Sequence, residues 1–348
     1  MALLPEHSAL QHERAPRPLP LFLDLVRRAA SDDPSLARDA LAGLRVYESA
    51  ERAAPQPPKP EIARVGSACL RDHGGSGPPA ILIPSLINPP RILDLDAEVS
   101  LASAVARMGR RALLLDWGPA AGRATLDVAG HVEQLLVPLL REIGEPAALV
   151  GYCLGGTMAI AAANLAPCER VATLAAPWHF RGYPDESRAA LKAMWRHSEP
   201  AAKAIGALPM EVLQAAFWSL DPARTVTKFA AFGKLDPRSA EARRFVTLED
   251  WANAGEPLPY PAARELIVDL FECDVTGRGE WRVAGKAVTD RPAMPMVHLV
   301  AAHDRISPRQ AGPEDDNRLI EAGHVGMVVG SARAELHRAL EAFLTPCR

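Results

Sequence analysis

Short apolar runs alternate with helix-like segments along most of this chain, and this alternation limits the possible folds more than any other feature. The runs have the length and composition of buried strands. They lie at residues 79–84, 111–117, 148–151, 170–176, 294–304 and 317–324. Apolar spacing predicts helices at 95–109, 126–143, 157–166 and 332–344. Such alternation predicts an α/β fold, in which helices cover both faces of a mostly parallel sheet.

The N-terminal part of the chain departs from this pattern. Helices are predicted at 19–30 and 35–50, and the proline-rich stretch APQPPKP follows them. Clustered prolines are typical of linkers. We therefore expect an N-terminal helical cap with its linker over 1–60 and the main domain over 61–348.

The alternation breaks again at 177–292, where predicted helices dominate and aromatic residues collect. The aromatic residues are Trp178, Phe180, Trp195, Phe217, Trp218, Phe229, Phe232, Trp251 and Phe271. A helical insertion inside a βα series is typical of a lid over an active site, although an embedded small domain would give the same pattern. We expect a lid here, and its aromatic side chains, taken together, are candidates for the wall of an acyl pocket.

Charge and composition exclude several classes of protein. The 348 residues include 39 Lys and Arg against 42 Asp and Glu, and the resulting net charge of −3 argues against a nucleic-acid-binding surface. The first residues lack a basic region followed by an apolar run, and no stretch reaches the roughly 18 apolar residues of a membrane span. We expect a cytoplasmic protein without a membrane span.

Cysteine and histidine usage argues against disulfides and metals. The five cysteines are Cys69, Cys153, Cys168, Cys273 and Cys347. Their odd number, wide spacing and lack of a CxxC pair indicate neither a disulfide framework nor a structural zinc site. His298 and His303 have no HExxH motif or carboxylate cluster beside them, so no metal site is expected.

One of these cysteines stands in a motif with chemical meaning. The sequence LVGYCLGGT (149–157) joins a predicted strand to a predicted helix, and Gly151, Gly155 and Gly156 surround Cys153. This is the pattern of a nucleophile elbow with cysteine in place of serine. An elbow holds its nucleophile on a strained turn that needs small neighbours, and the helix N-terminus stabilises a thiolate. The alternative is a structural cysteine beside a glycine-rich helix start.

An acid and a histidine are expected downstream of such an elbow, each at the C-terminal end of a strand. Asp304 ends the run at 294–304 and His324 ends the run at 317–324, in the order Cys, Asp, His. Taken singly, the aspartate has an alternative as a turn residue and the histidine as a core residue. With the elbow they predict a triad of Cys153, Asp304 and His324.

An oxyanion hole should accompany this triad. The backbone N–H of Leu154 would form half of it. The other half is expected from the loop after the first main strand, where Ser85, Leu86 and Ile87 are the candidates. The alternative for this loop is a proline-rich turn without a role.

Four segments together resemble the polyhydroxyalkanoate synthase family. They are PSLINPPRILDLD (84–96), LLLDWG (113–118), GYCLGGT (151–157) and GHVGMVVG (323–330). The resemblance runs through nearly the whole chain, whose length is closest to the short catalytic subunit of the two-subunit class. It implies an α/β-hydrolase fold with a helical lid. After Asp304, this chain has Arg305 and Arg309 where the family has a histidine and often a tryptophan.

The resemblance implies an acyltransferase that polymerises 3-hydroxyacyl-CoA through a thioester on Cys153 and releases CoA. It implies no cofactor, because the CoA thioester is the substrate. The implied partners are a second synthase subunit or a second copy of the chain, and the surface of a polyester granule. Two alternatives stay open: a cysteine-nucleophile hydrolase, such as an acyl-CoA thioesterase or a polyester depolymerase, and a non-catalytic granule-associated partner protein.

Overall fold

The chain divides into two compact units. The computed structural model describes residues 14–52, 54, 56–314 and 317–345. The helical unit contains residues 1–55 and 217–254, and the sheet unit contains residues 56–216 and 255–348. What the sequence analysis predicts for 1–13 and for Cys347 lies outside the described residues.

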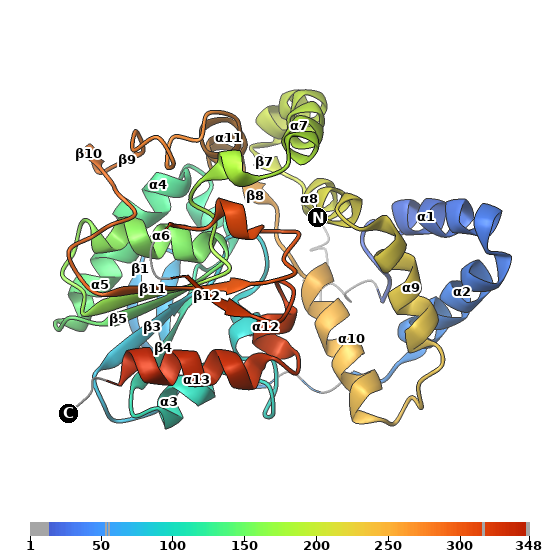
Figure 1. Cartoon of the computed structure of the whole chain (residues 1–348), viewed down its shortest axis with the longest axis horizontal. Coiled ribbons are helices and arrows are strands. Elements are labelled where there is room, and N and C mark those ends of the chain that lie inside the picture. Colours follow the sequence, from blue (N-terminus) through green and yellow to red (C-terminus); the bar gives the residue numbers. More distant parts are fainter. Residues whose placement is uncertain (1–13, 53, 55, 315–316, 346–348) are drawn as a thin grey trace, which may run out of the picture. The chain divides into compact units, whose positions relative to one another are not determined.

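The sheet unit is built on eight strands in the order β1-β2-β4-β3-β5-β6-β11-β12 (Figure 1). They are β1 (Glu61–Val65), β2 (Ala68–Asp72), β3 (Pro79–Ile83), β4 (Arg111–Asp116), β5 (Ala148–Tyr152), β6 (Arg170–Leu174), β11 (Met296–Ala301) and β12 (Asn317–Ile320). The strand β2 pairs antiparallel with β1 and β4, and the other neighbouring pairs are parallel. The predicted mostly parallel sheet is confirmed.

Helices cover both faces of this sheet, with α6 on one face and α3 and α13 on the other (Figure 1). The helices are α3 (Leu101–Arg107), α4 (Val128–His131), the π-helical η3 (Val132–Leu136), α5 (Val137–Ile143), α6 (Leu154–Ala163), α12 (Gly326–Val329) and α13 (Arg333–Leu344). Every residue of α6 is buried, so this helix lacks the polar stripe of a surface helix. Its N-terminus is therefore held by packing on all sides.

Two details of this unit differ from the sequence prediction. The helix predicted from residue 95 begins only at Leu101. An Asp96 carboxylate oxygen accepts from the N–H groups of Glu98 and Val99, both at 2.8 Å, and the Ser100 hydroxyl caps the helix. These side-chain bonds hold a turn where the apolar spacing predicts a helix. The antiparallel strands β1 and β2 were not predicted at all.

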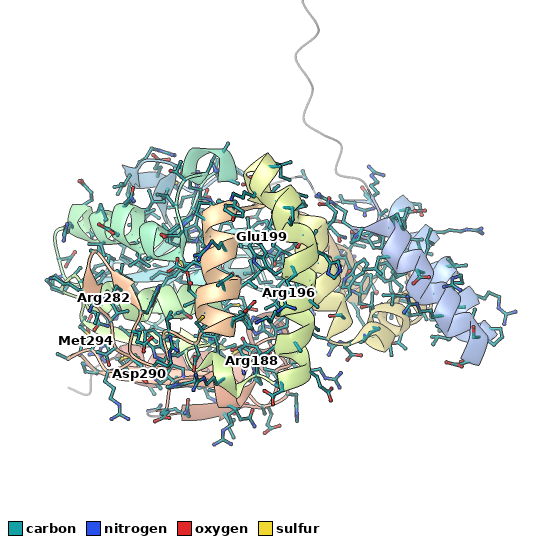
Figure 2. The ribbon with its side chains drawn as sticks, turned by 90° about the horizontal axis from the view of Figure 1, so that it is seen from above. Arg188, Arg196, Glu199, Arg282, Asp290 and Met294 are labelled. Atoms are coloured by element: carbon teal, nitrogen blue, oxygen red, sulfur yellow. The ribbon has the colours of Figure 1, made fainter. Side chains whose placement is uncertain are left out.

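The part of the predicted insertion that belongs to the sheet unit is mainly helical. It contains η4 (Phe180–Gly182), α7 (Asp185–Ile205), β7 (Ala207–Leu208), the start of α8 (Met210–Ser219), β8 (Leu258–Pro259), α11 (Tyr260–Arg264), the π-helical η5 (Glu265–Glu272), β9 (Arg282–Val283) and β10 (Lys286–Ala287). Figure 2 shows α7, which carries Arg188, Arg196 and Glu199, beside the helix formed by α11 and η5. Arg188 donates to the carbonyls of Phe271 and Glu272, both at 3.3 Å, and so satisfies acceptors at the end of η5.

The helical unit contains the two N-terminal helices and two helices from the middle of the chain (Figure 1). These are α1 (Leu19–Asp32), α2 (Pro34–Ser49), α9 (Pro222–Phe232) and α10 (Ala240–Asn253). The Phe229 ring meets those of Phe22 at 4.8 Å and Tyr47 at 5.6 Å, and the Tyr47 hydroxyl donates to Asp250 at 2.6 Å. The two predicted N-terminal helices are confirmed, but residues 217–254, assigned from the sequence to the lid, form one core with them.

Candidate active site

Cys153 occupies the sharp turn between β5 and α6. Its φ is 55° and its ψ is −133°, a region that residues other than glycine rarely adopt. Its N–H donates to the Leu174 carbonyl of β6 at 2.9 Å, and its own carbonyl accepts from Gly156 at 2.8 Å. The side chain is partly exposed. Backbone bonds to both sides therefore hold a strained turn that presents a thiol at a helix N-terminus.

The three glycines of the motif are required by the close approach of neighbouring atoms. A Cβ atom on Gly151 would lie 2.5 Å from the Gly155 carbonyl oxygen, and one on Gly156 would lie 2.4 Å from the Ala176 side chain. A Cβ atom on Gly155 would lie 2.2 Å from the carbonyl oxygen of Ile83, the last residue of β3. The elbow thus packs directly against the start of the loop that follows β3.

Gly155→Ala is expected to lower the free energy of unfolding by about 2 kcal/mol or more, because the new methyl group overlaps backbone that cannot move freely. Alanine is otherwise favoured over glycine in a helix by about 1 kcal/mol. A loss of stability on Gly155→Ala would therefore have the opposite sign to the ordinary helix preference. Gly326→Ala is the matched control, since a Cβ there meets nothing closer than 4.0 Å. Chemical denaturation of both variants checks the prediction, and a neutral effect at Gly155 would contradict it.

His324 and Asp304 lie together at the same edge of the sheet as the elbow. The distance between His324 Nδ1 and Asp304 Oδ2 is 2.7 Å. The other carboxylate oxygen accepts from the backbone N–H groups of Ile306 and Ser307, both at 2.8 Å. The Asp304 side chain is fully buried, and each of its oxygens has a donor beside it. Its orientation toward the imidazole is therefore fixed.

The imidazole also meets Cys153. Its ring lies close enough to Cys153 for the charge of a thiolate there to act on it. Burial of the ring acts to lower the pKa of His324, but the negative charges of Asp304 and of a Cys153 thiolate, with the hydrogen bond to Asp304, raise it to about 10. The structure thus brings the three predicted triad residues together, with His324 in the middle.

The predicted oxyanion residues lie beside the elbow, but they differ in whether their backbone N–H groups already have an acceptor. Leu154 is the first residue of α6, where a backbone N–H has no acceptor within the helix. The Ile87 N–H is 3.4 Å from the Ser85 hydroxyl oxygen. Leu86 is buried, and the described residues provide no acceptor for its N–H. Leu86 is therefore better suited than Ile87 to donate to a substrate oxygen.

Two aromatic residues support this site and were not predicted to do so. The Trp117 indole N–H donates at 3.1 Å to the Pro84 carbonyl, at the start of the loop after β3 that carries Leu86 and Ile87. The Tyr152 hydroxyl donates at 3.3 Å to the His324 carbonyl, and its ring lies 5.1 Å from the imidazole. Trp117 lies in the segment LLLDWG and Tyr152 in the segment GYCLGGT. Their place in these motifs is the sequence signal from which a role at the site could have been predicted.

Two absences apply to the described residues. Within them, no helix is long and apolar enough to cross a membrane. Over the same part of the chain, no three His, Cys, Asp or Glu side chains gather as metal ligands would. His298 lies in β11, with Nδ1 at 2.7 Å from the Thr173 hydroxyl, and the exposed His303 pairs with Glu321 at 3.2 Å. Neither histidine belongs to such a group.

The sheet order, the elbow after β5 and the histidine after the last strand define an α/β-hydrolase fold. A solved structure with the same fold is epoxide hydrolase A from Mycobacterium thermoresistibile, with a TM-score of 0.50 and 19% identity over 83% of this chain and 98% of that one. This likeness concerns the fold alone.

Among curated proteins, the chain is related to polyhydroxyalkanoate polymerases, and the resemblance found in the sequence is confirmed. It is 27% identical over 275 residues to the poly(3-hydroxyalkanoate) polymerase subunit PhaC of Haloferax mediterranei, covering 73% of this chain and 55% of that protein. It is 25% identical over 290 residues to the PhaC subunit of Allochromatium vinosum, covering 76% and 80%. The chain thus spans about half the length of the Haloferax protein. No family model matches it.

Proposed function

We propose that this protein is an acyltransferase that polymerises 3-hydroxyacyl-CoA into polyhydroxyalkanoate. The observation that carries the proposal is the meeting of Cys153 with the buried His324–Asp304 pair in a chain related to PhaC subunits. A cysteine suits this chemistry because a CoA thioester is exchanged for an enzyme thioester of similar energy. The CoA thioester enters as the substrate, and no further cofactor takes part.

In the first half of the reaction, Cys153 becomes acylated. His324 takes the proton of the Cys153 thiol as the reaction begins, its raised pKa favours the imidazolium that results, and Asp304 holds the ring in place. The thiolate attacks the thioester carbonyl, and the oxyanion receives hydrogen bonds from the N–H groups of Leu154 and Leu86. The carbon–sulfur bond to CoA then breaks, and His324 returns the proton to the departing CoA thiolate.

In the second half, the acyl group leaves Cys153 for a hydroxyl group. The hydroxyl of another 3-hydroxyacyl unit or of the growing chain gives its proton to His324 and attacks the enzyme thioester. An ester bond forms as the bond to Cys153 breaks. The competing attack by water would yield free hydroxy acid, so the polymerase must exclude water where the hydrolase alternative admits it.

Partners and location belong to the same proposal. The names of the relatives describe a polymerase subunit, which supports a second subunit or a second copy of this chain as a partner. Growth of an insoluble polyester would place the protein at the surface of a granule. Sedimentation with and without polymer would test that placement.

The test is incubation of the purified protein with 3-hydroxybutyryl-CoA, with thiol release followed over time and the acyl product identified. We expect release that depends on Cys153 and yields insoluble polyester or ester-linked oligomers. Free hydroxy acid as the sole product would favour the hydrolase. Release that survives in Cys153→Ala would contradict the proposed nucleophile, and no release, even with extracts supplying a second subunit, would favour the non-catalytic role.

A further inference from the structure

Trp117 joins the end of β4 to the loop after β3 that carries Leu86. It directly follows β4, and its side chain is buried. The Pro84 carbonyl oxygen, which accepts from the Trp117 indole N–H at 3.1 Å, also lies against the elbow, because a Cβ atom on Gly155 would be 2.6 Å from it. The peptide group between Pro84 and Ser85 is therefore held from two sides.

A second contact closes the turn that follows this peptide group. The Ile87 N–H lies 3.4 Å from the Ser85 hydroxyl oxygen, as in the short turns that serine side chains stabilise. Leu86 lies between the two held groups, and its own N–H has no acceptor among the described residues. The direction of the Leu86 N–H is therefore set by its neighbours. The Trp117 indole supplies a hydrogen bond that ties this turn to the next strand of the sheet.

The indole is in turn supported by a buried histidine. The His131 ring meets the Trp117 ring edge-on, with centroids 5.7 Å apart and planes at 84°. Its Nδ1 lies 2.6 Å from the Asp127 carbonyl oxygen, and its Nε2 lies 3.3 Å from Arg123 Nη1. A carbonyl only accepts and a guanidinium only donates, so Nδ1 carries a proton and Nε2 does not. His131 is therefore neutral, and its ring is held in one orientation.

Arg123 completes this support. Its side chain is buried, and its Nε donates at 3.3 Å to the carbonyl of Gly118, the residue after Trp117. The guanidinium thus ties the backbone beside the indole to the histidine that packs on the indole. Burial of the ring and the charge of Arg123 lower the pKa of His131 to about 4, in agreement with a neutral imidazole. Turning the indole away from Pro84 would break these contacts.

We propose that Trp117 is a positioning residue that aims the Leu86 N–H at the oxygen of the reacting carbonyl. This inference rests on the proposed function and adds a residue that acts through the loop after β3 rather than on the substrate. A donor stabilises an oxyanion when it is held in place before the reaction, and the loss of one such donor slows acyl transfer by roughly 10²- to 10³-fold. The indole bond therefore acts on the rate of acylation rather than on substrate binding.

Trp117→Phe tests the proposal, because it keeps an aromatic ring beside His131 and removes the indole N–H. We expect single-turnover release of CoA from 3-hydroxybutyryl-CoA to slow by roughly 10- to 100-fold, with the affinity for the substrate little changed. Alkylation of Cys153 by iodoacetamide should keep its wild-type rate, because this displacement of iodide forms no oxyanion. Trp281→Phe is the matched control. Trp281 is 3% exposed, as Trp117 is, and its indole N–H donates to Glu265 at 2.7 Å, so its loss should leave CoA release unchanged.

A second variant keeps the test open if Trp117→Phe does not fold. His131→Leu leaves the indole N–H in place but removes the ring that supports it, so CoA release should again slow while the rate of alkylation does not. Alkylation is followed by mass on the peptide that contains Cys153, because the exposed Cys273 also reacts.

The outcomes separate this inference from the function beneath it. An equal loss of CoA release and of alkylation in Trp117→Phe would overturn the role of Trp117, because that result indicates a general structural effect on the elbow. Wild-type CoA release in both Trp117→Phe and His131→Leu would overturn it as well and leave the polymerase intact. Failure of the wild type to release CoA would overturn the proposed function itself. Acylation of Cys153 by p-nitrophenyl acetate, compared with alkylation, would then show whether Trp117 positions the oxyanion donor.

Discussion

Cys153→Ala should reduce CoA release from 3-hydroxybutyryl-CoA by at least roughly 10⁴-fold. Cys153→Gly should reduce it as strongly, but its free energy of unfolding should be higher than that of Cys153→Ala. The loss follows because neither alanine nor glycine has a thiol that could form the proposed enzyme thioester. The stability difference follows from the backbone at this position, with its φ of 55° and ψ of −133°. Such a conformation costs a residue with a side chain on the order of 1–3 kcal/mol.

The Gly variant at residue 153 is therefore expected to unfold with a free energy about 1 kcal/mol higher than the Ala variant. Ala190→Gly on the exposed part of α7 is the control, where the ordinary preference for alanine by about 1 kcal/mol should hold. Denaturant unfolding of Cys153→Ala, Cys153→Gly and Ala190→Gly measures these differences in the free energy of unfolding. Equal stability of the two Cys153 variants would show that the turn stores no strain.

Asp304→Asn should lower the rate of acyl transfer by roughly 10³- to 10⁴-fold without unfolding the loop. An amide oxygen can still accept from Ile306 and Ser307, so the backbone bonds survive. What is lost is the negative charge beside His324. The rate of CoA release should fall far more than the affinity for the substrate, and measuring the rate and the substrate binding separately checks this prediction.

The same substitution should change how stability depends on pH. The pKa of His324 is raised from 6.5 to about 10, so its protonation stabilises the folded state fully below about pH 6.5. This stabilisation is lost as the pH rises through 10. The free energy of unfolding of Asp304→Asn should fall less steeply over that window. Parallel pH profiles of wild type and variant would contradict the role of the ion pair.

Local sequence signals were sufficient to predict six of the eight strands of the sheet and to place Cys153, Asp304 and His324 at one edge of it. The parallel strands are short apolar runs with little polar character, and β5 is buried at all five positions. Because parallel strands end at one edge, residues that follow β5, β11 and β12 meet there without further information. This is why Cys153, Asp304 and His324 could be paired across the sequence.

Features that depend on contacts between distant segments could not be predicted from local sequence patterns. The hydrogen bond from Trp117 to Pro84 and the ring contact between Tyr183 and Phe271 join elements with no shared local pattern. The early turn at Asp96 depends on side-chain bonds that compete with a helix. The grouping of 217–254 with the N-terminal helices likewise depends on a shared core.

The discontinuous helical unit has a consequence for synthesis of the chain. Its first two helices emerge early, but the partners that bury Phe22 and Tyr47 follow only after residue 217. Chains are made from the N-terminus, and domains fold as units once their parts are present. The apolar faces of α1 and α2 therefore remain uncovered by α9 and α10 while the central strands are being made. Interrupted translation before residue 217 would leave a nascent chain suited to capture by a chaperone.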